Sequence, residues 1–206
     1  KIYYLDNMQL KTRRIAWEIL KRSSKSKRRL SDVSAEIFRK EDKKLNNQER
    51  RFITMLVQGT VRLSGRLDWE LQQVFIGKYN NLKENLRILL RLGAYQLLYM
   101  NNVPDYATVA TTVQLSKRIH SNFGGLTNAL LRKLIIQEER SEPDENTPIS
   151  TLSSYLSHPE WLINKWIKDQ DYRRARDLAE WNNATPSLWF RVNRINYSLS
   201  RFKYFL

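Results

Sequence analysis

The stretch RLGAYQLLYMNNVP, residues 91–104, decides the fold class of this chain. In and just before it, apolar residues and one glycine recur at spacings of three and four: Leu82, Leu86, Leu89, Leu90, Gly93, Leu97 and Met100. That spacing is typical of a helix that buries one face. Pro104 ends the pattern, because proline cannot extend a helix and restrains the residue before it. The stretch therefore predicts a buried helix from about Asn81 to the turn at Val103 and Pro104.

Two residues are unusual on this apolar face. Gly93 costs a helix about 1 kcal/mol relative to alanine, and Gln96 places an amide beside the buried stripe. We expect Gly93 to let a neighbouring helix approach closely. We expect Gln96 to bond backbone groups that are freed at the Pro104 turn. Gly93, Gln96 and Pro104 are therefore predicted to be structural residues.

The rest of the first 140 residues has the same helical periodicity. Thr12 precedes a helix with Ile15 and Ile19 pointing inward, and KRSSKSKRRLS (residues 21–31) is interpreted as a basic loop. A helix over 47–63 is expected to bury Met55 among its apolar residues. Further helices are predicted from residue 31 or 32 to 38 and over 64–77, 105–119 and 126–137. With only 6 glycines and 5 prolines in 206 residues, the chain is predicted to be mainly α, a bundle of about seven helices.

The chain changes character after residue 137. Residues 138–147 hold five acids and one arginine, and Pro143 and Pro148 discourage helix. This predicts a linker over 141–157. Beyond it we expect two short helices, a strand at SLWFRVN (187–193) and the start of a helix at SLSRFKYFL (198–206). A lone strand has no pairing partner and cannot form a core, so the chain is expected to end inside a second, incomplete α/β domain.

Positive charge is concentrated near the start of the chain. The net charge is +15, and the first thirty residues hold ten Lys or Arg against Asp6 and Glu18. Clustered cations bind nucleic-acid phosphates by releasing counterions, although a solvated basic face has the same composition. The predicted contacts are Arg13, Arg14, Lys21, Arg22, Lys25, Lys27, Arg28 and Arg29. Weaker candidates lie later in the chain: Lys117, Arg118, Arg132 and Lys133.

Several classes of site are excluded or disfavoured. The absence of cysteine excludes a disulfide, a thiolate zinc site and a cysteine nucleophile in these residues. His120 and His158 lie apart without an acidic partner at ligand spacing, so we expect no metal site, and we assign no catalytic residue. No apolar run reaches the roughly 18 residues of a membrane span, which predicts a soluble, cytoplasmic chain with no membrane partner. The oligomeric state is left open.

Four tryptophans near the end are expected in a core, although they could also stack on bases: Trp161, Trp166, Trp181 and Trp189.

Taken in order, several segments resemble one known family. They are RRIAWEIL (13–20), NNQERRFITMLVQGTVRLSGRLDWEL (46–71), LRILLRLGAYQLLYMNNVPDYATVATTVQLSK (86–117) and GGLTNALLRKL (124–134). Together they resemble the NusB/RsmB family of helical RNA-binding domains. The later segments HPEWLINKWIKDQ (158–170) and ARDLAEWNNATPSLWFRVN (175–193) resemble the region that follows this domain in RsmB (Sun/Fmu-type) 16S ribosomal RNA cytosine-C5 methyltransferases.

The resemblance implies a domain plan and a function. Residues 1–140 would be a NusB-like RNA-binding domain, 141–157 a linker, and 158–206 the beginning of the methyltransferase region. The partner would be RNA, specifically 16S rRNA, and the full-length parent would use S-adenosylmethionine. Such enzymes carry a glycine-rich cofactor loop and two cysteines that are absent here, so no cofactor is expected in this segment, and it should be inactive alone. Asn128 matches an asparagine of the family pattern and is expected to be structural.

Two other functions are compatible with parts of the pattern. One is a NusB-like transcription antitermination factor, a non-enzymatic protein that binds RNA and a ribosomal protein. Such a factor has no need of the segment after residue 158, so that segment discriminates against it. The other is a protein–protein module whose basic face meets an acidic partner. Salt-dependent RNA binding would separate this module from the two RNA-binding functions.

Overall fold

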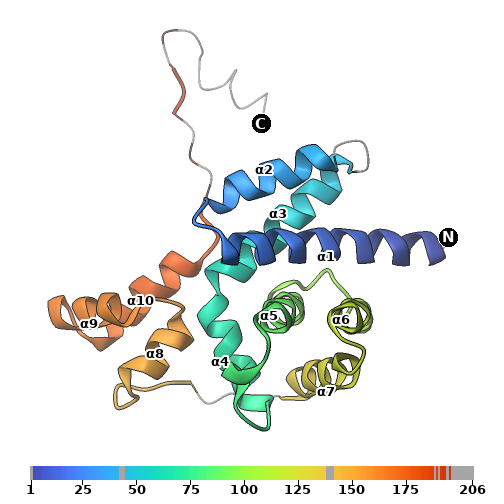
Figure 1. Ribbon diagram of the computed structural model, residues 1–206. Coiled ribbons are helices and arrows are strands. Elements are labelled where there is room, and N and C mark those ends of the chain that lie inside the picture. The colour runs from blue at the N-terminus through green and yellow to red at the C-terminus, as the bar shows by residue number, and fades with distance from the viewer. Residues whose placement is uncertain are drawn as a thin grey trace.

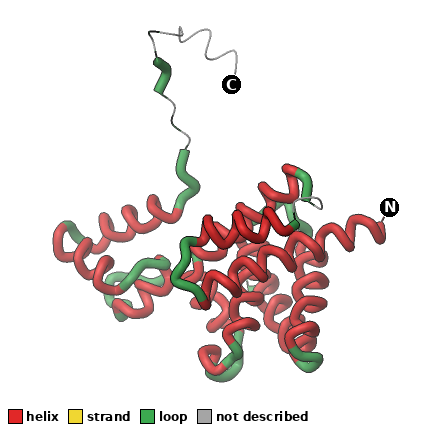
Figure 2. The backbone as a smooth tube through the Cα atoms, turned by 45° about the horizontal axis from the view of Figure 1, so that its top comes forward, coloured by secondary structure: helices red, strands yellow, loops and turns green. Residues whose placement is uncertain are grey.

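The computed structural model describes residues 2–41, 45–137, 142–187, 189, 191–193 and 195, with side chains from Leu10 onward. In these residues the regular structure is helical, with no strand (Figure 2). The α-helices are α1 (Ile2–Lys25), α2 (Leu30–Lys40), α3 (Asn47–Arg62), α4 (Ser64–Val74), α5 (Glu84–Tyr99), α6 (Asp105–Ile119), α7 (Phe123–Ile136), α8 (Ile149–Leu156), α9 (Glu160–Asp169) and α10 (Tyr172–Asn183), with a 3₁₀ turn at Tyr79–Asn81. The predicted mainly α fold is confirmed, and seven α-helices lie in the described part of the first 137 residues.

Local sequence signals explain where several helices begin and end. The side chain of Asn46 accepts a hydrogen bond from the Glu49 backbone N–H, and the Glu49 carboxylate accepts one from the Asn46 N–H, both at 2.8 Å. This reciprocal capping box satisfies two backbone donors at the start of α3. Pro104 is the N-cap residue of α6 with φ −62°, a value that its ring imposes. The helix predicted over 105–119 therefore has the bounds observed for α6.

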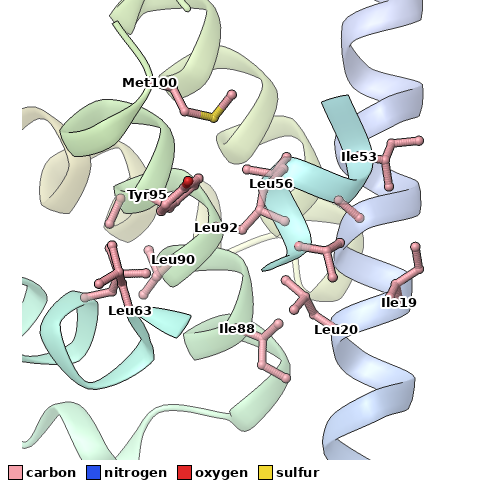
Figure 3. Packing of buried hydrophobic residues seen from close by; sticks show 14 of the residues in the cluster. Ile19, Leu20, Ile53, Leu56, Leu63, Ile88, Leu90, Leu92, Tyr95 and Met100 are labelled. Atoms are coloured by element: carbon pink, nitrogen blue, oxygen red, sulfur yellow. The ribbon is translucent and has the colours of Figure 1, made fainter. Parts of the chain in front are cut away.

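The core of the bundle surrounds α5. This helix contacts α1, α3, α4, α6 and α7 and lies between them in Figure 1. Figure 3 shows Leu20 of α1, Leu56 of α3 and Leu92 of α5 in one cluster, to which Ile19 and Ile53 also belong. Apolar burial of this kind is the main favourable contribution to folding. The stretch quoted first therefore lies at the centre of the bundle.

Three features of the first three helices differ from expectation. α1 begins at Ile2, so Thr12 lies inside it and does not precede it. α1 continues to Lys25, so the predicted basic loop is shortened to residues 26–29. Glu18 bonds Lys21 and Arg22 one turn later, which supports these last helical turns. Met55, expected inside, is 50% exposed, because the buried stripe of α3 runs through Ile53, Leu56 and Val57 instead.

The predicted linker is partly helical. Residues 149–156 form α8, so three helices rather than two follow the acidic stretch in the described residues. Leu152, Tyr155 and Leu156 of α8 are buried with Trp69 of α4, and Ile163 of α9 joins the same cluster. This second cluster attaches α8, α9 and α10 to the side of α4.

The end of the chain does not show the predicted α/β segment. Of the stretch 187–193, the structure describes residues 187, 189 and 191–193, which have no regular secondary structure. The predicted helix over 198–206 lies outside the described residues. The expectation of a tryptophan core is wrong for Trp161, Trp181 and Trp189, which are 67%, 75% and 91% exposed, while Trp166 is half-buried. Because α9 and α10 bury only the face that contains Ile163 and Ala179, aromatic residues on their other faces stay exposed.

Candidate nucleic-acid interface

A group of cations surrounds the connection between α1 and α2. The structure brings together six of the eight basic residues that the sequence singles out, and we call this group the basic junction: Lys21, Arg22, Lys25, Lys27, Arg28 and Arg29. No acid interrupts residues 21–29. All six except Lys21 are exposed, and the ammonium of Lys21 lies 4.9 Å from the centre of the Trp17 ring. The junction therefore presents positive charge on a helix end rather than on a long loop.

Two glutamates neutralise part of this charge. Glu18 pairs with Lys21 at 2.6 Å and with Arg22 at 2.7 Å. Glu36 of α2 pairs with Arg28 and Lys40, each at 2.6 Å. Hydrogen bonds from Lys40 and then Arg28 lower the pKa of the Glu36 carboxyl to about 2. These pairs hold the arginine side chains against the helices.

Three cations of the junction have no such partner. Among the described residues, no acidic side chain pairs with Lys25, Lys27 or Arg29, and all three are exposed. Unpaired exposed cations lose little on meeting a phosphate, because no existing ion pair has to be broken. They are therefore the part of the junction best suited to bind an anion.

The neighbouring arginines Arg13 and Arg14 have opposite environments. Arg13 is only 2% exposed; its Nε donates to Gln96 Oε1 at 2.6 Å, and its guanidinium lies 5.4 Å from the centre of the Phe52 ring. Burial lowers the pKa of Arg13 to about 10. Arg14 is partly exposed, with its Nη2 3.5 Å from Glu41 Oε1. Because successive helical residues point about 100° apart, Arg13 joins α1 to α5 while Arg14 remains near the surface.

The predicted role of Gln96 needs correction. Its Oε1 accepts from Arg13, and its Nε2 donates to the backbone oxygen of Leu92 at 2.9 Å. These two hydrogen bonds of the amide go to α1 and to its own helix, not to the Pro104 turn. The partner comes from another helix, because α1 contacts α5 at Gln96 and places the buried Arg13 guanidinium beside its amide.

Close helix packing surrounds Gly93. A Cβ added there would lie 3.1 Å from Thr112 Cγ2 and 3.3 Å from Leu131 Cδ1. These atoms belong to α6 and α7, so both helices approach α5 at the glycine. Asn128 Oδ1 accepts a hydrogen bond from Arg132 Nε at 3.1 Å, one turn later in α7.

The weaker basic candidates lie on other helices. Lys117 and Arg118 are exposed on α6, and Arg132 and Lys133 are exposed on α7. The aliphatic chain of Lys117 lies against Gly124, where an added Cβ would be 2.6 Å from Lys117 Cε. These four residues therefore lie on helices other than the two that carry the basic junction.

One functional candidate was missed by sequence reasoning. A groove of about 500 Å³ is lined by Arg62 and Arg66, by Tyr95 and Tyr99 of α5, and by Tyr155 of α8. These residues come from three distant segments, and none stands in a recognisable local motif. No signal in the sequence alone would have brought them together.

The described residues do not fit a metal or the methyl-donor cofactor. They contain no group of three or more His, Asp or Glu placed to hold a metal ion. Nucleotide-type cofactor sites of doubly wound α/β folds use a glycine-rich turn after a strand. The described residues have no strand, and their adjacent glycines, Gly124 and Gly125, lie in the first turn of α7. Within the same residues, no helix has the length and hydropathy needed to cross a membrane.

Comparison with known proteins agrees with the fold. The pattern of the NusB family matches residues 10–135. The pattern described as "Methyltr_RsmF/B-like, ferredoxin-like domain" matches residues 158–203. The crystal structure of PH0851 superposes with a TM-score of 0.63 and 19% identity, covering 86% of this chain and 39% of that one. At this identity the superposition shows a shared fold alone.

Curated relatives are ribosomal RNA methyltransferases by name. The probable ribosomal RNA small subunit methyltransferase B of Bacillus subtilis (strain 168) is 31% identical over 152 residues, which cover 73% of this chain and 34% of the relative. The ribosomal RNA small subunit methyltransferase B of Pectobacterium atrosepticum is 30% identical over 155 residues, covering 75% and 35%. The chain thus spans about a third of the length of these relatives. With its helical bundle and the match over residues 10–135, the chain belongs to the NusB family and is homologous to the N-terminal part of ribosomal RNA small subunit methyltransferases B.

Proposed function

We propose that this chain is the RNA-docking region of a ribosomal RNA (cytosine-C5) methyltransferase and holds that enzyme on 16S rRNA in the cytoplasm. The observation that carries the proposal is the basic junction on a chain homologous to methyltransferases B. Lys25, Lys27 and Arg29 are exposed there without an acidic partner among the described residues. Cations of this kind bind the RNA backbone independently of sequence, through release of counterions.

The fold positions the helical part of this surface. α1 is anchored by Ile15 and Ile19, which are buried against the core, so its last turn and the loop after it have a defined position. A phosphate that approaches Arg22 or Arg28 competes with Glu18 and Glu36 for the same guanidinium groups. The paired arginines can therefore bind a phosphate only by exchanging a glutamate for it. The three unpaired cations can bind a phosphate without breaking an ion pair.

We place the RNA-binding domain at residues 1–140 and the beginning of the methyltransferase region at 158–206. The connecting residues 141–157 include α8, whose packing on α4 joins the two parts. In the full-length enzyme S-adenosylmethionine would supply the methyl group, while the residues of this chain bind and orient the RNA. The match of residues 158–203 to a methyltransferase-associated domain supports this function over an antitermination factor, which has no need of such a segment.

The test is the salt dependence of RNA binding. The triple variant Lys25→Gln, Lys27→Gln and Arg29→Gln should bind a 16S rRNA fragment more weakly, measured by fluorescence anisotropy at several salt concentrations. Each lost phosphate contact removes about 0.7–0.9 from the log–log slope, so the slope should fall by about 2–3. The matched control replaces Lys117, Arg118 and Lys133 and should change the slope less. A triple variant with the affinity and slope of the unmodified chain would refute the docking role of the junction.

A further inference from the structure

The groove beside α5 has a composition that the basic junction lacks. It lies where the connection between α3 and α4 meets the end of α5, and α8 and the end of α10 close its other side. Its volume of about 500 Å³ is within the range of pockets that hold small organic ligands. The groove combines two arginines and three tyrosine rings with one acid, Glu180, whose carboxylate is paired with Arg176 at 2.9 Å. It therefore offers both positive charge and flat apolar surface.

The tyrosine side of the groove is a supported stacking surface. Tyr99 is stacked on Tyr95 with ring centroids 5.6 Å apart and an interplanar angle of 22°. Tyr95 is buried, and its ring lies so close to Gly59 that an added Cβ there would overlap it. Tyr99 itself is 42% exposed. A partly exposed ring held by a buried one can accept another planar group with little further ordering.

The two arginines of the groove differ in how they are held. The Arg66 guanidinium lies 3.6 Å from the centre of the Tyr155 ring, and its Nε donates to Glu70 Oε1 at 2.8 Å. Its charge is therefore already engaged by the fold. Arg62 Nε is buried and has no hydrogen-bond partner, and no acidic side chain pairs with Arg62 among the described residues. Arg62 as a whole is half-buried and lines the groove, so an anion there can meet its guanidinium charge, which no carboxylate among the described residues neutralises.

The groove is close to the proposed RNA surface. Val61 in the last turn of α3 and Ser64, the first residue of α4, line a small cavity together with Ser23 and Ser24 of α1. The two serines of α1 lie between Arg22 and Lys25 of the basic junction. A strand of RNA that leaves the junction therefore has to cross only the connection between α3 and α4 to reach Arg62.

We propose that the groove binds one unpaired nucleotide of the RNA, with its base stacked on Tyr99 and a phosphate at Arg62. The proposal rests on the proposed function, because it requires RNA to be bound. Base-to-aromatic stacking is available only to an unpaired base, since a base in a duplex is already stacked on both faces. Because α8 and α10 form walls of the groove, the site exists only while α8, α9 and α10 are packed on α4. Asn183 Nδ2 bonds Leu156 O at 2.7 Å and fixes the end of α10 there.

The experiment compares single-stranded and double-stranded RNA on the whole 206-residue chain. The probes are a fluorescent oligouridylate and an RNA duplex of matched length, and anisotropy gives both affinities. Arg62→Gln and, separately, Tyr99→Leu should weaken binding of the oligouridylate about tenfold, the loss typical of one stacking or charged contact. Binding of the duplex should be nearly unchanged. Arg51→Gln, which removes an exposed charge from the same helix α3, is the matched control and should affect both probes equally and weakly.

Each outcome separates the two proposals. Unchanged oligouridylate binding in both groove variants, or equal losses on both probes, would refute the groove site while leaving the basic junction intact. If the unmodified chain binds neither RNA, docking itself is refuted and the groove proposal falls with it. Thermal melts followed by circular dichroism establish that each variant is folded. Arg62→Gln keeps the test decisive if Tyr99→Leu unfolds the chain.

Discussion

Replacing Gln96 with leucine should destabilise the bundle by removing one hydrogen-bond partner from a buried cation. The Arg13 guanidinium is buried and donates to Gln96 at 2.6 Å across the interface between α1 and α5. Burial lowers the pKa of Arg13 from 12.5 to about 10, and one pKa unit corresponds to about 1.4 kcal/mol. Burial therefore disfavours the charged form by about 3 kcal/mol. A hydrogen bond to a charged group offsets about 1.5–3 kcal/mol of such a cost.

The expected loss in Gln96→Leu is therefore about 2 kcal/mol in the free energy of unfolding, with the ring of Phe52 continuing to contact Arg13. Arg13→Met combined with Gln96→Leu should recover most of this loss, because a well-packed apolar pair often replaces a buried polar pair without penalty. Urea denaturation followed by circular dichroism gives all four corners of this double-mutant cycle, and the coupling energy should be about 2 kcal/mol.

Two results would refute this reasoning. A Gln96→Leu variant as stable as the unmodified chain would show that the hydrogen bond does not offset the burial of Arg13. A double variant as unstable as the worse single variant would show that the losses come from packing and not from the lost hydrogen bond to a buried charge. RNA affinity measured alongside should not change in the double variant, because Arg13 is not at the surface.

Other predictions concern packing and pH. Gly93→Leu should cost about 1–3 kcal/mol in urea melts, because its side chain would meet Thr112 and Leu131; the control Gly125→Leu, where an added Cβ meets nothing within 4 Å, should be neutral or slightly stabilising. If both variants melt alike, close packing at α5 is not what requires the glycine. Arg28→Gln should raise the pKa of Glu36 from about 2 toward its ordinary value in an NMR titration. Because the folded pKa is depressed, the contribution of these ion pairs to stability is present above about pH 4.5 and is lost as the pH falls through about 2. An unshifted titration in the variant would contradict the role of Arg28.

Elements formed by local contacts were predictable from the sequence. Apolar spacing and Pro104 placed α6 at its observed bounds, and the spacing of leucines identified α5 as a buried helix. These signals are local because helical hydrogen bonds and side-chain neighbours are separated by three or four residues. The same reasoning failed for α8, where acids and prolines nearby suggested a linker. Burial of Leu152 and Leu156 against Trp69 stabilises that short helix instead.

The tertiary structure alone decided which charged residues are available for binding. Arg13 and Arg14 are adjacent and chemically identical, yet one is buried and the other lies near the surface. The partner that makes the difference, Gln96, is 83 residues away, and no local pattern reports a contact at that distance. The groove follows the same rule, since Arg62, Tyr99 and Tyr155 meet only after α8 docks on α4. Sequence periodicity determines which face of a helix is apolar. Which charged and aromatic side chains form a site is determined by the packing of the helices, because that packing brings together residues that are distant in the sequence.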